Sequence, residues 1–199
     1  MKRLLTLAGG LLVALAVPAF AASGLQTAVF SGGCFWSMQH DLEHVPGVVD
    51  TVVGYAGGTE PHPTYEQVSA ERTGYLESIK VTFDPTRLSY AQLLDRYWHA
   101  IDPTDQGGAF CDRGHSYQSA IFAGSPEQRR VAEASKAALE HGALKGRVVT
   151  PIREATTFWP AEGYHQHYAD KHPFEYGAYR TGCGKDAGLR RIWGPLALK

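Results

Sequence analysis

The sequence predicts an α/β fold in two layers, with helices packed against a mixed sheet. Segments typical of strands and helices follow one another in the order strand, helix, two strands, helix, strand, helix, strand, and such an order produces a mixed sheet with helices on it. The chain has 199 residues and shows no linker, repeat or low-complexity tract between these segments. Since this length suits one domain with a sizeable core, residues 22–199 are expected to form a single domain.

The first strand is predicted at residues 26–31, and a helix follows it at once. Gly32-Gly33 supplies the permissive backbone of a tight turn. The apolar residues that come next, Phe35, Met38, Leu42 and Val45, recur at helical spacing. Cys34 is therefore expected in the first turn, where unpaired amides and the helix dipole favour a thiolate. The alternative is that Cys34 is a small buried apolar residue, as free cysteines often are.

The next strands are predicted at residues 48–53 and 75–83, with a short helix after Pro63-Thr64 between them. Along residues 75–83 every second side chain falls on one apolar face, and Glu77 falls on that face too. Burial there would raise the pKa of Glu77 and suit it to donate a proton near neutral pH. The alternative is a solvated Glu77 at a sheet edge.

The second half begins with a helix capped by Ser89, whose apolar stripe ends at Ile101. Residues 102–117 then form a long loop rich in Gly, Asp and Pro, and such loops are often functional. The remaining elements are expected to be strands at 119–122 and 148–153, with a helix at 125–142 between them.

The N-terminus has the pattern of a secretory signal peptide. Lys2 and Arg3 precede an apolar run at residues 4–17, and Ala19-Phe20-Ala21 is a small-x-small cleavage signal. We predict cleavage after Ala21 and a periplasmic or secreted protein. An uncleaved anchor and a lipoprotein are the alternatives, but no cysteine follows the cleavage site, and no later stretch reaches the roughly 20 apolar residues of a membrane span.

The charge and cysteine content narrow the class of function. Without Lys2 and Arg3 the chain has 17 basic and 20 acidic residues and no basic stripe, so nucleic acid is not an expected partner. The three cysteines, Cys34, Cys111 and Cys183, are too few for a disulfide scaffold. Their odd number leaves one thiol unpaired or exchanging, which indicates reactive sulfur.

Seven motifs follow one another in order between Val29 and Trp193. They are Gly32-Gly33-Cys34-Phe35-Trp36, Leu42 through Pro46-Gly47-Val48, Gly54-Tyr55-Ala56-Gly57-Gly58, Pro63-Thr64-Tyr65, Thr73-Gly74-Tyr75-Leu76-Glu77, Asp102-Pro103-Thr104 and Asp112-Arg113-Gly114. In this order they resemble the A-type peptide methionine sulfoxide reductases. The resemblance implies a ferredoxin-like β-α-β-β-α-β core and thiol-dependent reduction of the S epimer of methionine sulfoxide, in oxidised proteins or as the free amino acid.

The resemblance also implies roles for individual residues. Cys34 would attack the sulfoxide sulfur, Glu77 would protonate its oxygen, and the hydroxyls of Tyr65 and Tyr117 would hold that oxygen. Asp112 would shape the same polar network. The substrate-binding residues would be Phe35 and Trp36, which would enclose the methyl group of the sulfoxide.

Attack would leave Cys34 as a sulfenic acid, which a second thiol must resolve. Some relatives carry that thiol three residues after the nucleophile, but this chain has Ser37 there. Cys183, in a glycine-flanked C-terminal segment, is the first choice. Cys111 is the alternative, and a relay through both is chemically reasonable.

The implied enzyme needs no organic cofactor and no metal, because sulfur carries both electrons. A thioredoxin-like partner would reduce the final disulfide, and an exported enzyme would need an exported reductant of this kind. We expect a monomer without stable membrane association.

An exported metal-binding module is the function of a different class that the composition allows. Its ligands would come from Cys111 and Cys183 and from histidines including His99, His115, His165, His167 and His172. On a helix after Pro160-Ala161-Glu162, however, His165 and His167 would point about 200° apart and could not share an ion.

Overall fold

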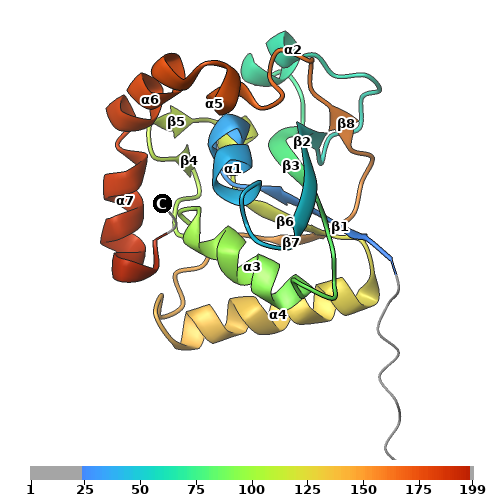
Figure 1. Ribbon diagram of the computed structural model, residues 1–199, viewed down its shortest axis with the longest axis vertical. Helices are drawn as coiled ribbons and strands as arrows, with labels where there is room; N and C mark the ends of the chain where they lie inside the picture. The colour runs from blue at the N-terminus through green and yellow to red at the C-terminus, as the bar shows by residue number, and fades with distance from the viewer. Residues whose placement is uncertain (1–23, 198–199) are drawn as a thin grey trace, which may run out of the picture.

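The computed structural model describes residues 24–197, and Figure 1 shows their arrangement. The predicted signal peptide, residues 1–21, lies outside the described residues. Among those that are described, no helix has both the length and the apolar character of a membrane span.

The main sheet has six strands in the order β7-β6-β1-β3-β2-β8. All its neighbours are antiparallel except β6 and β7, which are parallel, so the sheet is mixed as predicted. Its strands are β1 (Gln26–Ser31), β2 (Val48–Ala56), β3 (Leu76–Phe83), β6 (Ala120–Ala123), β7 (Ile152–Glu154) and β8 (Trp159–Pro160). A separate pair is formed by β4 (Gly108–Ala109) and β5 (Asp112–Arg113).

The helices pack around this sheet, as Figure 1 shows. They are α1 (Phe35–Leu42), α2 (Tyr65–Ser69), α3 (Tyr90–His99), α4 (Pro126–His141), α5 (Tyr168–Lys171), α6 (Pro173–Gly182) and α7 (Lys185–Trp193), with short 3₁₀ turns η1 (His115–Tyr117) and η2 (Gly194–Leu196). The series β1-α1-β2-β3-α3-β6, with its strands in the spatial order β6-β1-β3-β2, is the predicted ferredoxin-like core. The predicted α/β fold class is therefore confirmed.

The larger hydrophobic core lies between one face of the sheet and the helices α1 and α3. Phe30 and Val81 from the sheet meet Met38 of α1 and Leu94 of α3 there, and all four side chains are buried. Each such burial contributes roughly 1.5–3 kcal/mol before the entropy of ordering is subtracted. On the other face, side chains including Leu76 and Phe122 are covered by Phe158 from a loop, so the fold has two main layers.

The helix starts follow the predicted capping. Ser89 accepts a hydrogen bond from the amide of Gln92, whose side chain bonds back to Ser89, and Ser125 accepts one from Gln128. These side chains satisfy amides that have no partner inside the helix.

Three regions differ from the predicted elements. The loop at 102–117 contains β4, β5 and η1, and the strand predicted at 148–153 begins only at Ile152. The C-terminal helices α5, α6 and α7 were not predicted. Only Tyr176 and Arg180 of α6 are buried, so this helix has no apolar stripe for sequence periodicity to detect.

Candidate active site

Cys34 occupies the N-cap of α1, one residue earlier than the first turn in which we expected it. Its carbonyl accepts hydrogen bonds from the amides of Ser37 at 3.1 Å and Met38 at 3.2 Å. Gly33 has φ +96°, and a Cβ there would lie 2.7 Å from that of Ala109. The turn before the thiol therefore requires glycine, because a side chain would meet both strain and a clash.

Glu77 lies beside the start of this helix. Its Oε2 accepts a hydrogen bond of 2.9 Å from the amide of Phe35, and the residue is only 2% exposed. The strand that carries it, β3, has β1 on one side and β2 on the other. A solvated position at a sheet edge is therefore wrong for Glu77.

Burial is the main reason why the pKa of Glu77 is raised, to about 8. The bond from the Phe35 amide opposes this rise, while the negative charges of Asp112 and Glu71 add to it. At pH 7 Glu77 is therefore protonated in most molecules.

The thiol of Cys34 differs from the prediction of a lowered pKa. Burial raises the pKa of Cys34 to about 12, and the charges of Glu77 and Asp112 raise it further. Hydrogen bonds with the Tyr179 hydroxyl and the Trp36 backbone lower it, but they do not compensate. The expected effect of the helix N-terminus is thus outweighed, chiefly by desolvation, and the resting group at neutral pH is a thiol.

Tyr65 and Tyr117 come from the first residue of α2 and the last residue of η1. Burial raises the pKa of Tyr65 to about 12, and it raises that of Tyr117 as well. The charges of Glu77 and Cys34 act on both phenols. The two hydroxyls therefore share one site with the thiol and the carboxyl group, and they remain hydrogen-bond donors at neutral pH.

Phe35 and Trp36 form an aromatic wall next to Cys34. The ring of Phe35 is buried and stacks with Tyr65, with centroids 6.5 Å apart. Trp36 lies flat against Tyr168 of α5 at 3.8 Å, and its Nε1 donates a hydrogen bond of 3.0 Å to His165. This wall presents aromatic surface beside the thiol.

The segment of His165 is a turn, so the helix on which we placed His165 and His167 is wrong. The helix α5 begins only at Tyr168, and His167 has a left-handed backbone with φ 52°. His165 is 1% exposed, and burial lowers its pKa, so the ring is neutral. Because its Nδ1 accepts from Trp36, its proton belongs on Nε2.

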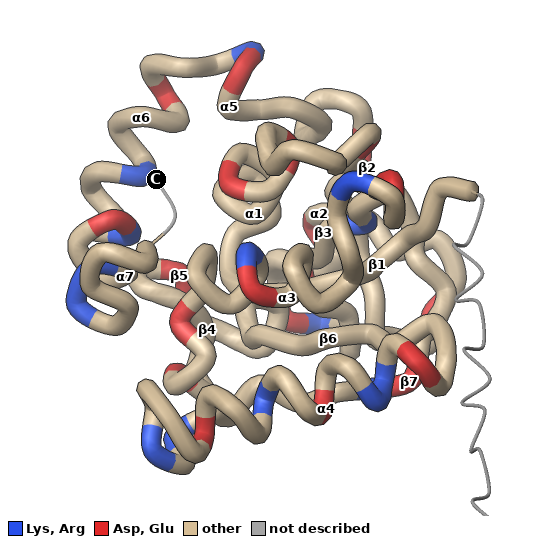
Figure 2. Tube along the Cα trace, turned by 60° about the horizontal axis from the view of Figure 1, so that its bottom comes forward, with Lys and Arg blue, Asp and Glu red and all other residues tan. Residues whose placement is uncertain are grey.

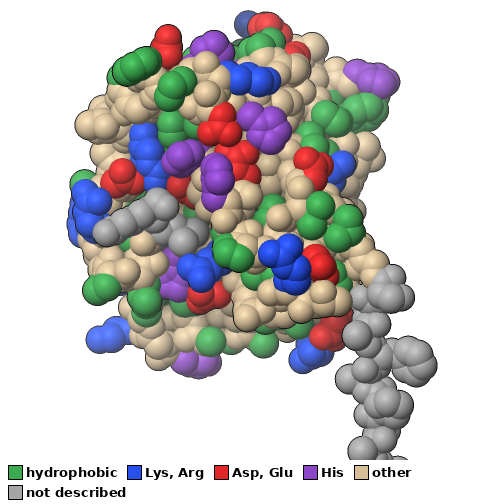
Figure 3. Space-filling model, viewed as in Figure 1, with side chains coloured by type: hydrophobic (Ala, Val, Ile, Leu, Met, Phe, Trp, Pro, Cys, Tyr) green, Lys and Arg blue, Asp and Glu red, His purple; other side chains and the backbone are tan. Residues whose placement is uncertain are grey.

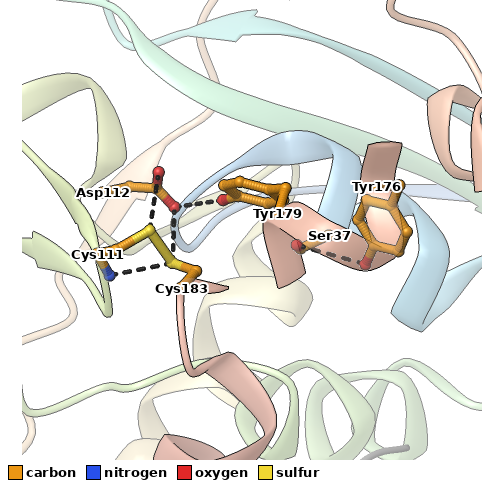
Figure 4. The surroundings of a disulfide bond; sticks show 6 residues. All are labelled: Ser37, Cys111, Asp112, Tyr176, Tyr179 and Cys183. Carbon is orange, nitrogen blue, oxygen red and sulfur yellow. Dashed lines mark hydrogen bonds between the residues drawn. A yellow bond between two sulfur atoms is a disulfide. The ribbon is translucent and has the colours of Figure 1, made fainter. Parts of the chain in front are cut away.

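Cys111 and Cys183 form a disulfide, with Cys34 as a free thiol. Figure 4 shows Asp112 beside this bond. Its carboxylate oxygens lie 3.7 Å from the sulfur of Cys111 and 3.8 Å from that of Cys183. Cys111 is exposed and Cys183 is partly buried, so Cys111 is the more accessible residue of the pair.

Tyr179 is a site residue that the sequence analysis missed. Its hydroxyl donates a hydrogen bond of 2.5 Å to Asp112, and it lies close enough to Cys34 to lower the pKa of that thiol. It therefore joins the free thiol to the surroundings of the disulfide. Tyr179 precedes Cys183 by four residues, about one helical turn, and this spacing was the available signal.

A buried ion network fixes the C-terminal helices to α1. Asp41 of α1 lies 2.8 Å from Arg180 of α6 and 2.9 Å from Lys185 of α7. The hydroxyl of Tyr176 lies 3.4 Å from the Oγ of Ser37 and 2.8 Å from Arg180. The helices that flank Cys183 are thus held against the helix that follows Cys34.

Two groups of side chains in residues 24–197 could supply three metal ligands each. They are Cys111 with Asp112 and Cys183, and His40 with Glu43 and Asp170. Neither group contains any of the histidines considered for a metal-binding module, and the first has its sulfurs joined. Figure 3 shows histidine and acidic side chains close together over α1. Exposed acidic groups are common in proteins without a bound ion.

The surface has a further large cavity. A cavity of about 910 Å³ is lined by residues of α1, α5, α6 and α7, none of which is a predicted site residue. Figure 2 shows Lys and Arg interspersed with Asp and Glu along the described trace.

Comparison with known proteins covers almost the whole chain. A family model described as peptide methionine sulfoxide reductase matches residues 26–196. Peptide methionine sulfoxide reductase MsrA 2 of Caulobacter vibrioides is 48% identical over 196 residues, which cover 98% of this chain and 100% of the relative.

Solved structures agree with this match. Methionine sulfoxide reductase A of Corynebacterium diphtheriae has a TM-score of 0.69 and 33% identity, with 76% of each chain covered. Mxr1 from Saccharomyces cerevisiae in reduced form has a TM-score of 0.73 and 28% identity, covering 77% of this chain and 88% of that one. The range matched by the family model contains every predicted site residue, from Cys34 to Cys183.

Proposed function

Because this chain belongs to the peptide methionine sulfoxide reductase family, we propose that it reduces the S epimer of methionine sulfoxide, with Cys34 as nucleophile and Glu77 as proton donor. The observation that carries the assignment of roles is the position of a buried carboxyl group with a raised pKa against the first amide of the helix whose N-cap is Cys34. Substrates are oxidised methionines in proteins and the free amino acid.

The first step transfers oxygen from the substrate to Cys34. Glu77 gives its proton to the sulfoxide oxygen, and the sulfur of Cys34 attacks the sulfoxide sulfur. The carboxylate of Glu77 then takes up the proton of the thiol. The S–O bond of the substrate breaks as Cys34 becomes a sulfenic acid, so methionine sulfur gains the two electrons that Cys34 sulfur loses. Glu77 ends the step protonated, as it began.

Tyr65, Tyr117 and the aromatic wall select and orient the substrate. Both phenols keep their protons and so donate hydrogen bonds to an oxygen that becomes more negative during proton transfer. Phe35 and Trp36 contact the methyl group. A sulfoxide joins a polar oxygen to an apolar carbon, and a selective site satisfies both.

The sulfenic acid is resolved by a relay through both remaining cysteines. Cys183 attacks the sulfur of Cys34 and releases water, and Cys111 then attacks Cys183, which frees Cys34 and leaves the Cys111–Cys183 disulfide. A disulfide between the two candidate resolving residues beside a free Cys34 supports a relay that uses both. Asp112, close to both sulfurs, is placed to accept their protons.

A thioredoxin-like protein then reduces the disulfide by attack on the exposed Cys111. Two electrons and two protons restore both thiols. The predicted signal peptide supports export and a periplasmic or secreted reductant. Protein N-terminal sequencing after cell fractionation tests both the cleavage after Ala21 and the compartment, and size-exclusion chromatography tests the expected monomer.

The activity is tested with residues 22–199, each epimer of a methionine sulfoxide substrate, and dithiothreitol. The expected result is methionine from the S epimer alone, and none from Cys34→Ser. If folded and fully reduced protein produced methionine from neither epimer, the proposal would be overturned.

A further inference from the structure

We propose that Glu71 is a positioning residue of this reductase, which binds the turn bearing Tyr117 to the helix bearing Tyr65. The inference rests on the proposed function, because it concerns the two hydroxyls assigned to the sulfoxide oxygen. Glu71 itself does not contact the substrate in this proposal.

The carboxylate of Glu71 acts as an N-cap for η1 from another segment. One oxygen accepts hydrogen bonds from the amides of His115 at 2.8 Å and Ser116 at 3.2 Å, and the other accepts from the Ser116 hydroxyl at 2.7 Å. The residue at the N-cap itself, Gly114, has no side chain with which to cap the turn. Glu71 supplies the missing acceptor.

The fit around this carboxylate is close. A Cβ at Gly114 would lie 2.3 Å from the Oε1 of Glu71, and Ser116 is buried. A further bond of 3.2 Å joins the His115 ring to the carbonyl of Gly74. The segment after α2 therefore contacts η1 at His115 and Ser116, the two residues that precede Tyr117.

Glu71 makes these contacts from a strained backbone conformation. Its φ is 58°, in the left-handed region that favours glycine. Glu71 follows the short helix α2, whose first residue is Tyr65. A glutamate held in this conformation by its contacts fixes the distance between the two tyrosine-bearing segments.

The charge of Glu71 also reaches Glu77. It is one of the charges that raise the pKa of Glu77, together with that of Asp112. The titratable groups that interact with Glu77 are Cys34, Tyr55, Tyr65, Glu71, Asp112 and Tyr117. Because the charge of Glu71 raises the pKa of Glu77, removal of that charge makes it easier for Glu77 to lose its proton.

Two substitutions separate the positioning effect from the charge effect. Glu71→Gly removes the hydrogen bonds but relieves the backbone, so the protein folds, and we expect kcat/KM to fall about tenfold or more as Tyr117 shifts. Glu71→Gln keeps one acceptor oxygen and removes the charge. We expect a smaller loss at pH 7 and an alkaline limb of the single-turnover rate at lower pH than in the wild type.

The control is Glu66→Gln, which removes an exposed carboxylate from α2 itself and should leave rate and pH profile unchanged. Wild-type kcat/KM and an unshifted alkaline limb in both Glu71 variants would overturn the inference.

Amide hydrogen exchange provides a measurement that does not depend on activity. The amides of His115 and Ser116 should be protected in the wild type and in Glu66→Gln, and they should exchange at least tenfold faster in Glu71→Gly. Equal protection in all three would refute the cap even if the wild type reduced neither epimer. A failure of the proposed function alone would leave the difference in protection intact.

Discussion

The amide of Phe35 donates a hydrogen bond of 2.9 Å to the carboxylate of Glu77, so the start of α1 and the middle strand of the sheet meet at one carboxyl group. Cys34 immediately precedes that amide in the chain. The geometry of the turn at Gly33-Cys34 therefore sets the position of the nucleophile and that of the proton donor together.

Substitution of Glu77 by Gln should remove the proton donor while it preserves the size of the side chain. We expect the single-turnover rate at pH 7 to fall roughly 10²–10⁴-fold, the usual contribution of general acid catalysis. In the wild type this rate should fall as pH rises through about 8, because Glu77 then loses its proton. In Glu77→Gln the residual rate should not show this limb. A wild-type rate that climbs between pH 8 and 10 would instead identify the thiolate as the reacting form and contradict the account.

Substitution of Tyr179 by Phe tests the link between Cys34 and Asp112. The Tyr179 hydroxyl lowers the pKa of the Cys34 thiol. Loss of this hydroxyl should therefore raise that pKa and slow the alkylation of Cys34 by iodoacetamide roughly threefold to tenfold. Tyr164→Phe, at an exposed tyrosine, is the matched control. Identical alkylation rates in wild type and Tyr179→Phe would rule out the link.

The cysteine relay predicts different end states for two substitutions. Cys183→Ser should complete one turnover and then stop with a thioredoxin-like reductant, because Cys34 cannot be resolved by its first partner. Cys111→Ser should accumulate the Cys34–Cys183 disulfide, which peptide mapping without reduction identifies. Undiminished multiple turnover in Cys183→Ser would show that this residue is not needed for resolution.

Substitution of Asp41 by Asn should destabilise the fold far more than loss of a surface pair. Asp41 has a fully buried side chain between Arg180 and Lys185, and its loss leaves Lys185 without its carboxylate and Arg180 with Asp186 alone. We expect the free energy of unfolding to fall by about 3–5 kcal/mol in urea denaturation. Glu127→Gln, which breaks the exposed pair with Arg130, should change it by less than about 1 kcal/mol. Similar losses in both variants would mean that the buried network does not stabilise the protein.

Much of this site could be predicted from local sequence. Period-2 alternation placed Glu77 on the apolar face of its strand, and helical spacing placed Cys34 near a helix start. These are local patterns, and the structure retains both. The strand order was not local information, which is why burial of Glu77 between β1 and β2 could not be separated from an edge position.

The parts that the sequence did not reveal depend on contacts across the chain. Tyr179 meets Asp112 from 67 residues away, and the disulfide joins residues separated by 72. The raised pKa of Cys34 follows chiefly from burial and also from the carboxylates that folding brings to it. Helices α5 and α6 pack through buried ions and aromatic rings instead of an apolar stripe, so their periodicity is weak.

The most direct test of the account is to trap the oxidised form of Cys34 in a single turnover. The double variant Cys111→Ser with Cys183→Ser, fully reduced, would be mixed with one equivalent of the S epimer and then with dimedone, and analysed by mass spectrometry. The account predicts one equivalent of methionine and one dimedone adduct, located on Cys34. Formation of methionine with no adduct on Cys34, or no methionine from the folded variant, would contradict the assignment of Cys34 as the nucleophile.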